Sequence, residues 1–227
     1  MTIDPVPKYM TAPDALPLIH EHCPGDVSSD APAVVLLHGR GTDERDLLPI
    51  GARLPDDLDV LGVRAPESMD MPDSYTWYEL DLADGLHDSQ PDPDGFRRSL
   101  DRLSEFVDGA VDAYDLDADR VGLLGFSQGA ITALSALLER PDAFRWLVAL
   151  SGYLADAHED RVDAAAGKPV FVGCGTMDQV IPPERAEHAA DRLAEAGADV
   201  RFERYRVGHG TTAAEITDVV AWVEDRF

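Results

Sequence analysis

The amino-acid sequence predicts an α/β fold in which a doubly wound, mostly parallel β-sheet is flanked by helices. Short, continuous apolar runs alternate with longer segments of helical periodicity from about residue 33 to the C-terminus. Apolar runs without polar alternation are typical of strands that helices cover on both faces. The length of 227 residues suits one large domain, and no linker or repeat divides it. We therefore expect residues 1–227 to form a single domain, in which residues 1–30 stay unassigned.

Six strands are expected along the chain. The first is the run AVVLL, and the last alternates more in polarity, as an edge strand does. Helices between the strands require right-handed crossovers, which place successive strands parallel to one another. The expected strands cover residues 33–37, 59–63, 121–124, 146–150, 170–172 and 200–207.

Four helices are expected between and after these strands, each with apolar residues on one side. The third begins at a pair of prolines, which suit the first turn of a helix. The acidic stretch 81–95 has no period and is expected to be a loop. The second helix is expected at residues 130–138, and the apolar positions of the other three are Phe96, Leu100, Leu103, Val107 and Val111; Ala186, Ala189, Ala190 and Leu193; and Ile216, Val219, Val220 and Val223.

The chain is strongly acidic. It has 44 acidic and 19 basic residues and a formal net charge of −25, with 31 Asp, two Lys and no Asn. The acids are spread along the whole chain and do not form an acidic tail. Nucleic acid is excluded as a partner, because binding a phosphate backbone requires Lys and Arg. Such a surface repels itself in dilute buffer, whereas 1 M salt shortens the Debye length to about 3 Å. We interpret the composition as a halophile's adaptation to molar salt.

Nothing in the sequence indicates a secreted or membrane-bound protein. Residues 1–17 lack a basic segment followed by an apolar one, and no stretch approaches the roughly 18 apolar residues of a membrane span. Cys23 and Cys174 are expected to be free thiols, and no ligand cluster suggests a metal site. We expect a cytoplasmic protein that needs no cofactor or metal. Its oligomeric state stays open, a homodimer included.

The sequence GFSQG at residues 125–129 carries the main chemical signal. It lies where an expected strand ends and an expected helix begins, as a nucleophile elbow requires. Gly125 and Gly129 remove side chains that would collide in this sharp turn, so the Ser127 hydroxyl stands above the sheet. A serine hydroxyl is a weak nucleophile at neutral pH, and it needs a base and an acid that orients the base.

Position along the chain selects the base and the acid. Sites built on this turn have the order serine, acid, histidine, and His209 lies between two glycines just before the last helix. Asp178 follows the strand at 170–172, whereas Asp199 precedes a strand and would lie at the opposite end of the sheet. We therefore expect Ser127, Asp178 and His209 to form a catalytic triad.

Two backbone N–H groups must bind the oxyanion of the tetrahedral intermediate. One comes from the residue after the nucleophile, which is Gln128. The loop after the first strand is expected to supply the other from Arg40, because the glycines on both sides of it free the backbone. An aromatic such as Trp77 either lines the acyl pocket or belongs to the core.

These segments resemble the phospholipase/carboxylesterase family of α/β-hydrolases, which includes the acyl-protein thioesterases. They run in the family's order over most of the chain, and FSQ within the turn is more specific than GxSxG alone. The matching segments are LLHGRG at 36–41, DLLP at 46–49, GFSQGA at 125–130, LSGY at 150–153, GTMD at 175–178, VIP at 180–182 and GH at 208–209.

The resemblance implies an α/β-hydrolase fold and a hydrolase that acts through an acyl-enzyme. It gives the triad and the two oxyanion residues the roles named above, and it implies that Gly39, Trp77 and Val180 contact the substrate. The expected substrate is a small carboxylic ester, or a thioester, of short or medium acyl length. Two alternatives stay open. A dienelactone-hydrolase-like enzyme typically uses Cys as its nucleophile, and a non-catalytic scaffold of this fold usually lacks a member of the triad.

The acidic composition predicts a dependence on salt. Dialysis from molar salt to dilute buffer is expected to unfold or inactivate the protein, because unscreened repulsion then acts between its carboxylates. Melting temperature and esterase activity, followed across the dialysis, measure the effect. Values that stay constant would contradict the interpretation.

Overall fold

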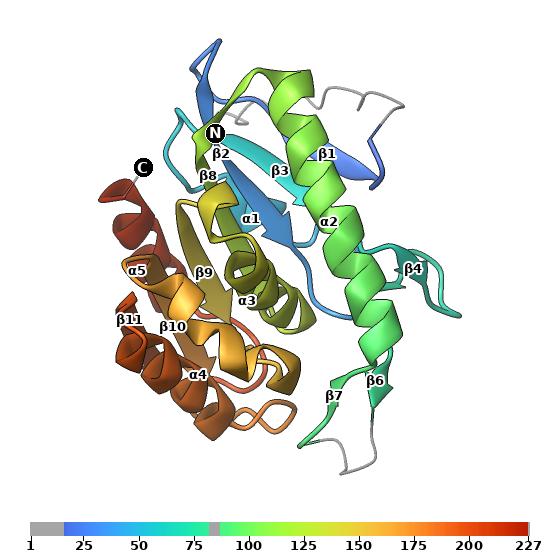
Figure 1. Ribbon diagram of the computed structural model, residues 1–227, viewed down its shortest axis with the longest axis vertical. Helices are drawn as coiled ribbons and strands as arrows, with labels where there is room; N and C mark the ends of the chain where they lie inside the picture. The colour runs from blue at the N-terminus through green and yellow to red at the C-terminus, as the bar shows by residue number, and fades with distance from the viewer. Residues whose placement is uncertain (1–15, 82–86, 227) are drawn as a thin grey trace, which may run out of the picture.

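A seven-stranded sheet with the order β1-β3-β2-β8-β9-β10-β11 runs through the computed structural model, which describes residues 16–81 and 87–226 (Figure 1). Strands β3, β2, β8, β9, β10 and β11 run parallel, and β1 pairs antiparallel with β3. This confirms the expected doubly wound, mostly parallel sheet. The strands are β1 His20–Cys23, β2 Ala31–Leu37, β3 Asp59–Val63, β8 Leu116–Phe126, β9 Trp146–Leu150, β10 Pro169–Gly175 and β11 Asp199–Tyr205.

Helices cover both faces of the sheet. Figure 1 shows α2, α3 and α4 on one face, and α1 and α5 on the other. No helix in the part of the chain that the structure describes is long and apolar enough to cross a membrane. The helices are α1 Leu48–Gly51, α2 Pro93–Tyr114, α3 Gln128–Glu139, α4 Pro183–Glu195 and α5 Ala213–Glu224, and the 3-10 helices are η1 Pro141–Ala143 and η2 Asp156–Ala165.

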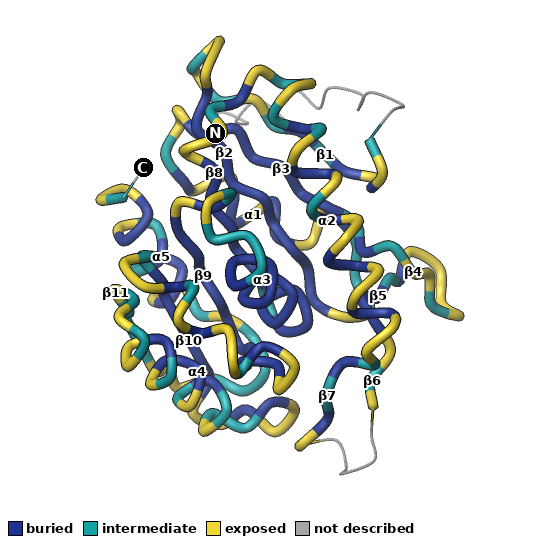
Figure 2. The backbone as a smooth tube through the Cα atoms, viewed as in Figure 1, coloured by how far each residue is buried: buried dark blue, intermediate teal, exposed yellow. Residues whose placement is uncertain are grey.

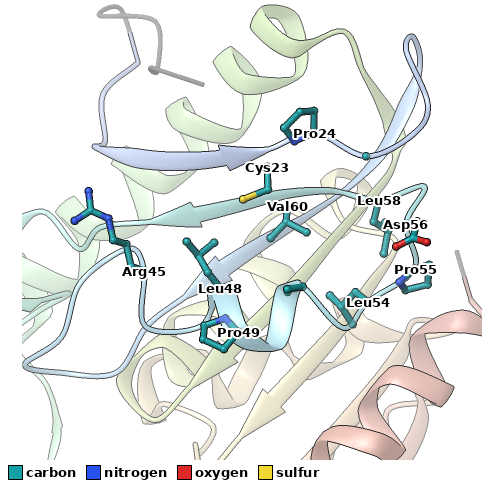
Figure 3. Close-up of a pocket in the computed structure, with 13 residues that line it drawn as sticks. Cys23, Pro24, Arg45, Leu48, Pro49, Leu54, Pro55, Asp56, Leu58 and Val60 are labelled. Carbon is teal, nitrogen blue, oxygen red and sulfur yellow. The ribbon is translucent and has the colours of Figure 1, made fainter. Parts of the chain in front are cut away.

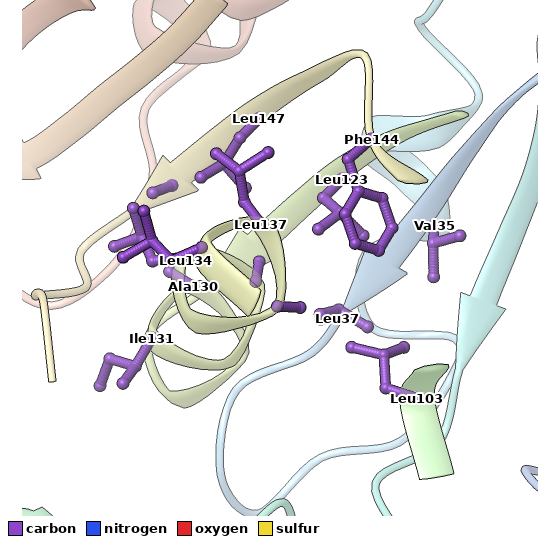
Figure 4. Close-up of a cluster of buried hydrophobic side chains, with 14 of the residues drawn as sticks. Val35, Leu37, Leu103, Leu123, Ala130, Ile131, Leu134, Leu137, Phe144 and Leu147 are labelled. Carbon is purple, nitrogen blue, oxygen red and sulfur yellow. The ribbon is translucent and has the colours of Figure 1, made fainter. Parts of the chain in front are cut away.

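The two faces of the sheet carry separate hydrophobic clusters, because successive strand residues point to opposite sides. On β2, Val35 and Leu37 belong to the cluster formed with α2, α3 and α4, whereas Val34 and Leu36 pack with α1 and α5. Figure 4 shows the first cluster, in which side chains of α3 meet those of β2, β8 and β9. Every residue of α3 from Gln128 to Leu138 is buried, as the dark blue tube in Figure 2 shows. Helix α3 is therefore enclosed by the sheet on one side and by α2 and η2 on its other sides.

The strand order changes direction between β2 and β8. The chain passes from β2 to β3 on one side, returns to β8 on the other side of β2, and then continues outward to β11. In open α/β sheets, ligands bind outside the carboxyl ends of the strands at such a switch point. The loop that begins at His38 and the turn at Ser127 both lie there.

The prediction that residues 81–95 form a loop is wrong in part. Short strands β6 Leu80–Asp81 and β7 Gln90–Pro91 pair antiparallel, and helix α2 already begins at Pro93. Asp92 caps this helix, since its carboxylate accepts a hydrogen bond of 2.8 Å from the N–H of Gly95. A local cap of this kind starts a helix without any apolar period, which is why the pattern missed it. Residues 82–86 lie outside the described residues.

The N-terminal segment contributes an edge strand that the apolar pattern did not predict. Strand β1 alternates between buried and half-buried residues, and it carries two buried histidines. His22 Nε2 lies 2.6 Å from the carboxylate of Asp59 on β3, and the N–H of Gly25 donates to the same carboxylate. Polar pairing holds this strand, so hydrophobic periodicity gives no signal for it. Cys23 on this strand and Cys174 are free, as expected.

Helix α5 begins with a buried capping box. The hydroxyl of Thr212 accepts from the N–H of Glu215 at 3.1 Å, and the Glu215 carboxylate accepts from the N–H of Thr212 at 3.3 Å. The second carboxylate oxygen, Oε1, is buried without a hydrogen-bond partner among the described residues. Burial raises the pKa of Glu215 to about 7. The protonated carboxyl therefore fits the folded state better than the carboxylate.

This raised pKa predicts how stability depends on pH. The native pKa of Glu215 is about 7, above the ordinary value of 4.5. The contribution of this carboxyl to the free energy of unfolding is therefore complete below about pH 4.5 and is lost as the pH rises through 7. Glu215→Gln keeps the capping acceptor and stays neutral. From pH 5 to pH 8, wild type is expected to lose about 1–3 kcal/mol of unfolding free energy relative to the variant.

Urea unfolding in molar salt at the two pH values measures this difference. Glu224→Gln, at an exposed position of the same helix, is the matched control and is expected to leave the pH dependence unchanged. Parallel stability curves for wild type and Glu215→Gln would show that the buried carboxyl does not titrate in this range.

Candidate active site

Ser127 sits in a strained turn between β8 and α3. Its backbone has φ 53° and ψ −119°, and its N–H donates to the carbonyl of Leu150 on the neighbouring strand at 2.8 Å. A Cβ atom at Gly129 would collide with the carbonyl oxygen of Leu37, and one at Gly125 would collide with the carbonyl of Gly129. The turn can therefore close only with glycine at both positions. Strain of this kind persists where the surrounding structure fixes it, and it is frequent at functional sites.

A chain of two hydrogen bonds joins Ser127 to Asp178 through His209. The distance from His209 Nε2 to Ser127 Oγ is 2.8 Å, and the distance from His209 Nδ1 to Asp178 Oδ2 is 2.7 Å. The ring of His209 also contacts that of Phe126, with 5.2 Å between centroids. The structure thus brings together three side chains from the ends of β8, β10 and β11.

Asp178 is held so that one carboxylate oxygen faces the imidazole. Its other oxygen, Oδ1, accepts from the N–H groups of Val180 and Ile181 at 2.8 and 3.0 Å. Only 1% of its side chain is exposed, so water does not compete for the carboxylate. Because a carboxylate only accepts hydrogen bonds, His209 carries its proton on Nδ1 and leaves Nε2 as an acceptor. Nε2 is then ready to take the proton of the serine hydroxyl.

The loop after β2 lies against the nucleophile. A Cβ atom at Gly39 would come within 3.6 Å of the Ser127 Cβ, and Arg40 lines the same pocket as Ser127 and Gln128. Gln128 is the first residue of α3, so its N–H has no acceptor within the helix. The expected pair of oxyanion residues therefore borders the serine on two sides.

His38 fixes the shape of this loop, a role that its sequence position did not reveal. Its Nδ1 donates to the carbonyl of Gly39 at 2.7 Å, and its Nε2 accepts from the N–H of Ala65 at 3.0 Å. Burial lowers the pKa of His38, which favours the neutral ring that these two bonds require. The histidine thus braces the loop instead of taking part as a base.

A small, mostly apolar cavity opens beside Ser127. Its volume is about 80 Å³. Leu80, Ile131 and Ile181 supply apolar walls, and Arg40 and Gln128 line the cavity together with the serine. The described residues that line it are Arg40, Tyr78, Leu80, Ser89, Ser127, Gln128, Ile131, Tyr153, Val180 and Ile181. The cavity suits a short apolar group attached to a carbonyl at Ser127.

Comparisons with known proteins give the family of this chain. A family model described as Phospholipase/Carboxylesterase matches residues 24–225. The chain belongs to the phospholipase/carboxylesterase family. It is 27% identical to acyl-protein thioesterase 1 of Candida albicans over 224 residues, which cover 89% of this chain and 95% of that protein.

Solved structures of esterases superpose on the fold. Esterase PE8 has a TM-score of 0.81 and 26% identity, with 92% of this chain and 99% of that chain covered. The carboxylesterase of Bacillus cereus has a TM-score of 0.78 and 26% identity, with 94% and 96% covered. The α/β-hydrolase fold and the assignment to a hydrolase family, both expected from the motifs, are thereby confirmed.

Trp77 was expected to contact the substrate, but it is not among the residues that line the cavity at Ser127. It is fully buried, its indole N–H donates to the carbonyl of His38 at 2.9 Å, and its carbonyl accepts from the hydroxyl of Ser99. The indole bond ties the ring to the loop that begins at His38, and the next residue, Tyr78, lines the cavity instead. Of the other residues expected at the substrate, Val180 lines the cavity and is 43% exposed.

The side chain of Gln128 has a second task that sequence reasoning missed. Its amide oxygen accepts from the N–H of Trp77 at 2.8 Å, and its amide nitrogen donates to the carbonyl of Tyr78 at 2.8 Å. The residue is buried. One residue thus presents its backbone N–H beside the serine and ties the segment that walls the cavity to α3.

A larger cavity, of about 450 Å³, lies between α1 and the edge of the sheet (Figure 3). Cys23, Arg45, Leu48 and Val60 are among its lining, and it shares no lining residue with the cavity at Ser127. Burial raises the pKa of the Cys23 thiol, which keeps it protonated and a poor nucleophile. No histidine is among the described residues that line it, so the thiol has no imidazole beside it.

The buried amide of Gln128 predicts a large effect on stability. Gln128→Ala leaves the N–H of Trp77 without its acceptor in a buried setting, and it opens a cavity at the start of α3. We expect the free energy of unfolding to fall by about 2–4 kcal/mol, as measured by urea titration. Gln179→Ala, at an exposed position, is the matched control and is expected to change it by less than about 0.5 kcal/mol. Equal stabilities of the two variants would contradict this role.

Proposed function

We propose that this protein is a serine carboxylesterase that cleaves carboxylic esters of short or medium acyl chains by two-step acyl transfer. One observation carries the proposal: the 2.8 and 2.7 Å hydrogen bonds that link Ser127, His209 and Asp178 in series. A hydroxyl, an imidazole and a carboxylate in this order form the arrangement that activates a serine.

In the first step, His209 Nε2 takes the proton of Ser127 as Oγ attacks the ester carbonyl carbon. Asp178 stabilises the imidazolium that forms and keeps its ring oriented. The N–H groups of Arg40 and Gln128 donate to the oxyanion of the tetrahedral intermediate. When this intermediate collapses, the bond to the alcohol breaks, and the leaving alcohol takes the proton from His209. The acyl group stays on Ser127.

In the second step, a water molecule takes the place of the alcohol. His209 removes a proton from the water as its oxygen attacks the acyl carbonyl, and the same two N–H groups hold the second oxyanion. Collapse of this intermediate breaks the bond to Ser127 Oγ, which takes the proton back from His209. The products are a carboxylic acid and an alcohol, and the residues of the chain supply every group that these steps require.

The cavity and the relatives bear on the substrate. The apolar walls beside Ser127 favour a short acyl chain, since apolar groups gain from burial. Acyl-protein thioesterase 1 of Candida albicans is named for thioester cleavage, and the same acyl-enzyme forms from a thioester. We therefore propose esters as the main substrates and thioesters as accepted ones. Arg40 lines the cavity, and its guanidinium lies 3.3 Å from the carboxylate of Glu79.

Variants of the triad test the proposal with p-nitrophenyl acetate and p-nitrophenyl butanoate in molar salt. Ser127→Ala is expected to lower kcat by about 10⁵–10⁶-fold, because the nucleophile is lost. Asp178→Asn is expected to lower it by about 10⁴-fold, because the imidazole then adopts the wrong tautomer. Stopped-flow traces of wild type report the acyl-enzyme as a burst of nitrophenolate.

Glu187→Gln, a substitution of a half-buried helical carboxylate outside the site, is the control and is expected to retain wild-type rates. Wild-type rates no higher than those of Ser127→Ala would end the esterase assignment. They would favour the alternative of a non-catalytic scaffold.

A further inference from the structure

The cavity at Ser127 ends at Tyr153, and the ring of Tyr153 also lines a second cavity. The second cavity has a volume of about 690 Å³ and carries charged residues, among them Asp88, Glu159 and Arg185. Tyr153 is the only described residue that the two linings share, and it is 2% exposed. One aromatic ring therefore separates a small apolar space from a larger charged one.

Two residues hold this ring in place. The Tyr153 hydroxyl donates to the carbonyl of Ser89 at 2.8 Å, and the Arg185 guanidinium lies 3.2 Å from the ring centroid. Arg185 Nη1 also donates to the Ser89 carbonyl at 3.1 Å and to that of His87 at 3.2 Å. Tyr153 and Arg185 thus both bond the carbonyl of Ser89. The ring of Tyr153 is held by the Ser89 carbonyl at its hydroxyl and by the Arg185 guanidinium over its face. Burial raises the pKa of Tyr153, so its hydroxyl stays a donor.

The space on the serine side is small. Its volume is about 80 Å³. An apolar cavity of about 150 Å³ holds a benzene ring. The cavity at Ser127 is about half that size and therefore takes roughly three or four carbon atoms. A longer chain would meet the ring of Tyr153, which stands between it and the wider second cavity.

We infer that Tyr153, clamped by Ser89 and Arg185, is the wall that limits the acyl group to about four carbon atoms. The inference rests on the proposed esterase function and narrows it to short-chain esters. Tyr153 is a specificity-determining residue, since it touches the acyl chain and takes no part in proton transfer. Arg185, which holds the ring of Tyr153, is part of helix α4.

Chain-length profiles test this wall. We would measure kcat/KM for p-nitrophenyl acetate, butanoate, hexanoate and octanoate in molar salt, with rates normalised by fluorophosphonate active-site titration. For wild type, kcat/KM is expected to fall at least about tenfold from butanoate to octanoate, because a chain longer than the cavity cannot fit in it without displacing the carbonyl from Ser127. In Tyr153→Ala the two cavities merge, and the fall is expected to shrink to less than about threefold.

Tyr153→Phe is the matched control. It keeps the ring and its contact with Arg185, and Arg185 still holds the Ser89 carbonyl, so the wild-type profile is expected to persist. Tyr153→Leu provides a second shortened side chain if the alanine variant does not fold, and it is expected to move the limit to hexanoate.

The outcomes separate the two proposals. An octanoate rate in wild type equal to that of butanoate would overturn the wall, and so would an unchanged profile in both shortened variants. In either case the activity itself would still support the esterase assignment. Wild-type rates equal to those of Ser127→Ala on every ester would overturn both.

Discussion

The close approach of the first turn of α3 to the end of β2 is the constraint on which the site depends. Only a hydrogen atom fits where Gly129 meets the carbonyl of Leu37. This contact lets the helix begin directly over the sheet, so Ser127 is presented at a left-handed φ. It also sets the free N–H groups of the first turn beside the loop after β2. The positions of the proposed nucleophile and of the proposed oxyanion donors thus both follow from one backbone contact.

Polar groups around the site are fixed because each has one way to satisfy its hydrogen bonds. Asp178 uses one oxygen for two backbone N–H groups and the other for His209, so the imidazole is oriented before substrate arrives. His38 and Gln128 do the same for the oxyanion loop and for the segment at Tyr78. Groups held in this way need no reorganisation when charge develops in the reaction, which is the basis of electrostatic catalysis.

The site is compatible with a formal net charge of −25 because the buried carboxylate of Asp178 is satisfied by two backbone N–H groups and by His209. In the proposed mechanism the oxyanion accepts hydrogen bonds from two backbone N–H groups, and ions in solution screen such short contacts little. The negative charge is spread over the surface, where salt acts strongly. Catalysis and solubility are therefore controlled by separate parts of the molecule. A small apolar cavity likewise lies next to a larger charged one, and the ring of Tyr153 stands between them.

The sequence by itself determined the sheet, its main helices and the residues that meet at Ser127. Apolar runs and helical periods report burial directly, and the glycines around Ser127 mark a turn that few other residues allow. Only the tertiary structure decided where Trp77 points, that Tyr153 closes the cavity and that His20–Cys23 forms an edge strand. These features depend on polar contacts between segments far apart in the chain. Such contacts leave no periodic trace in the sequence, because each hydrogen bond joins only two residues and imposes no repeated spacing on the chain.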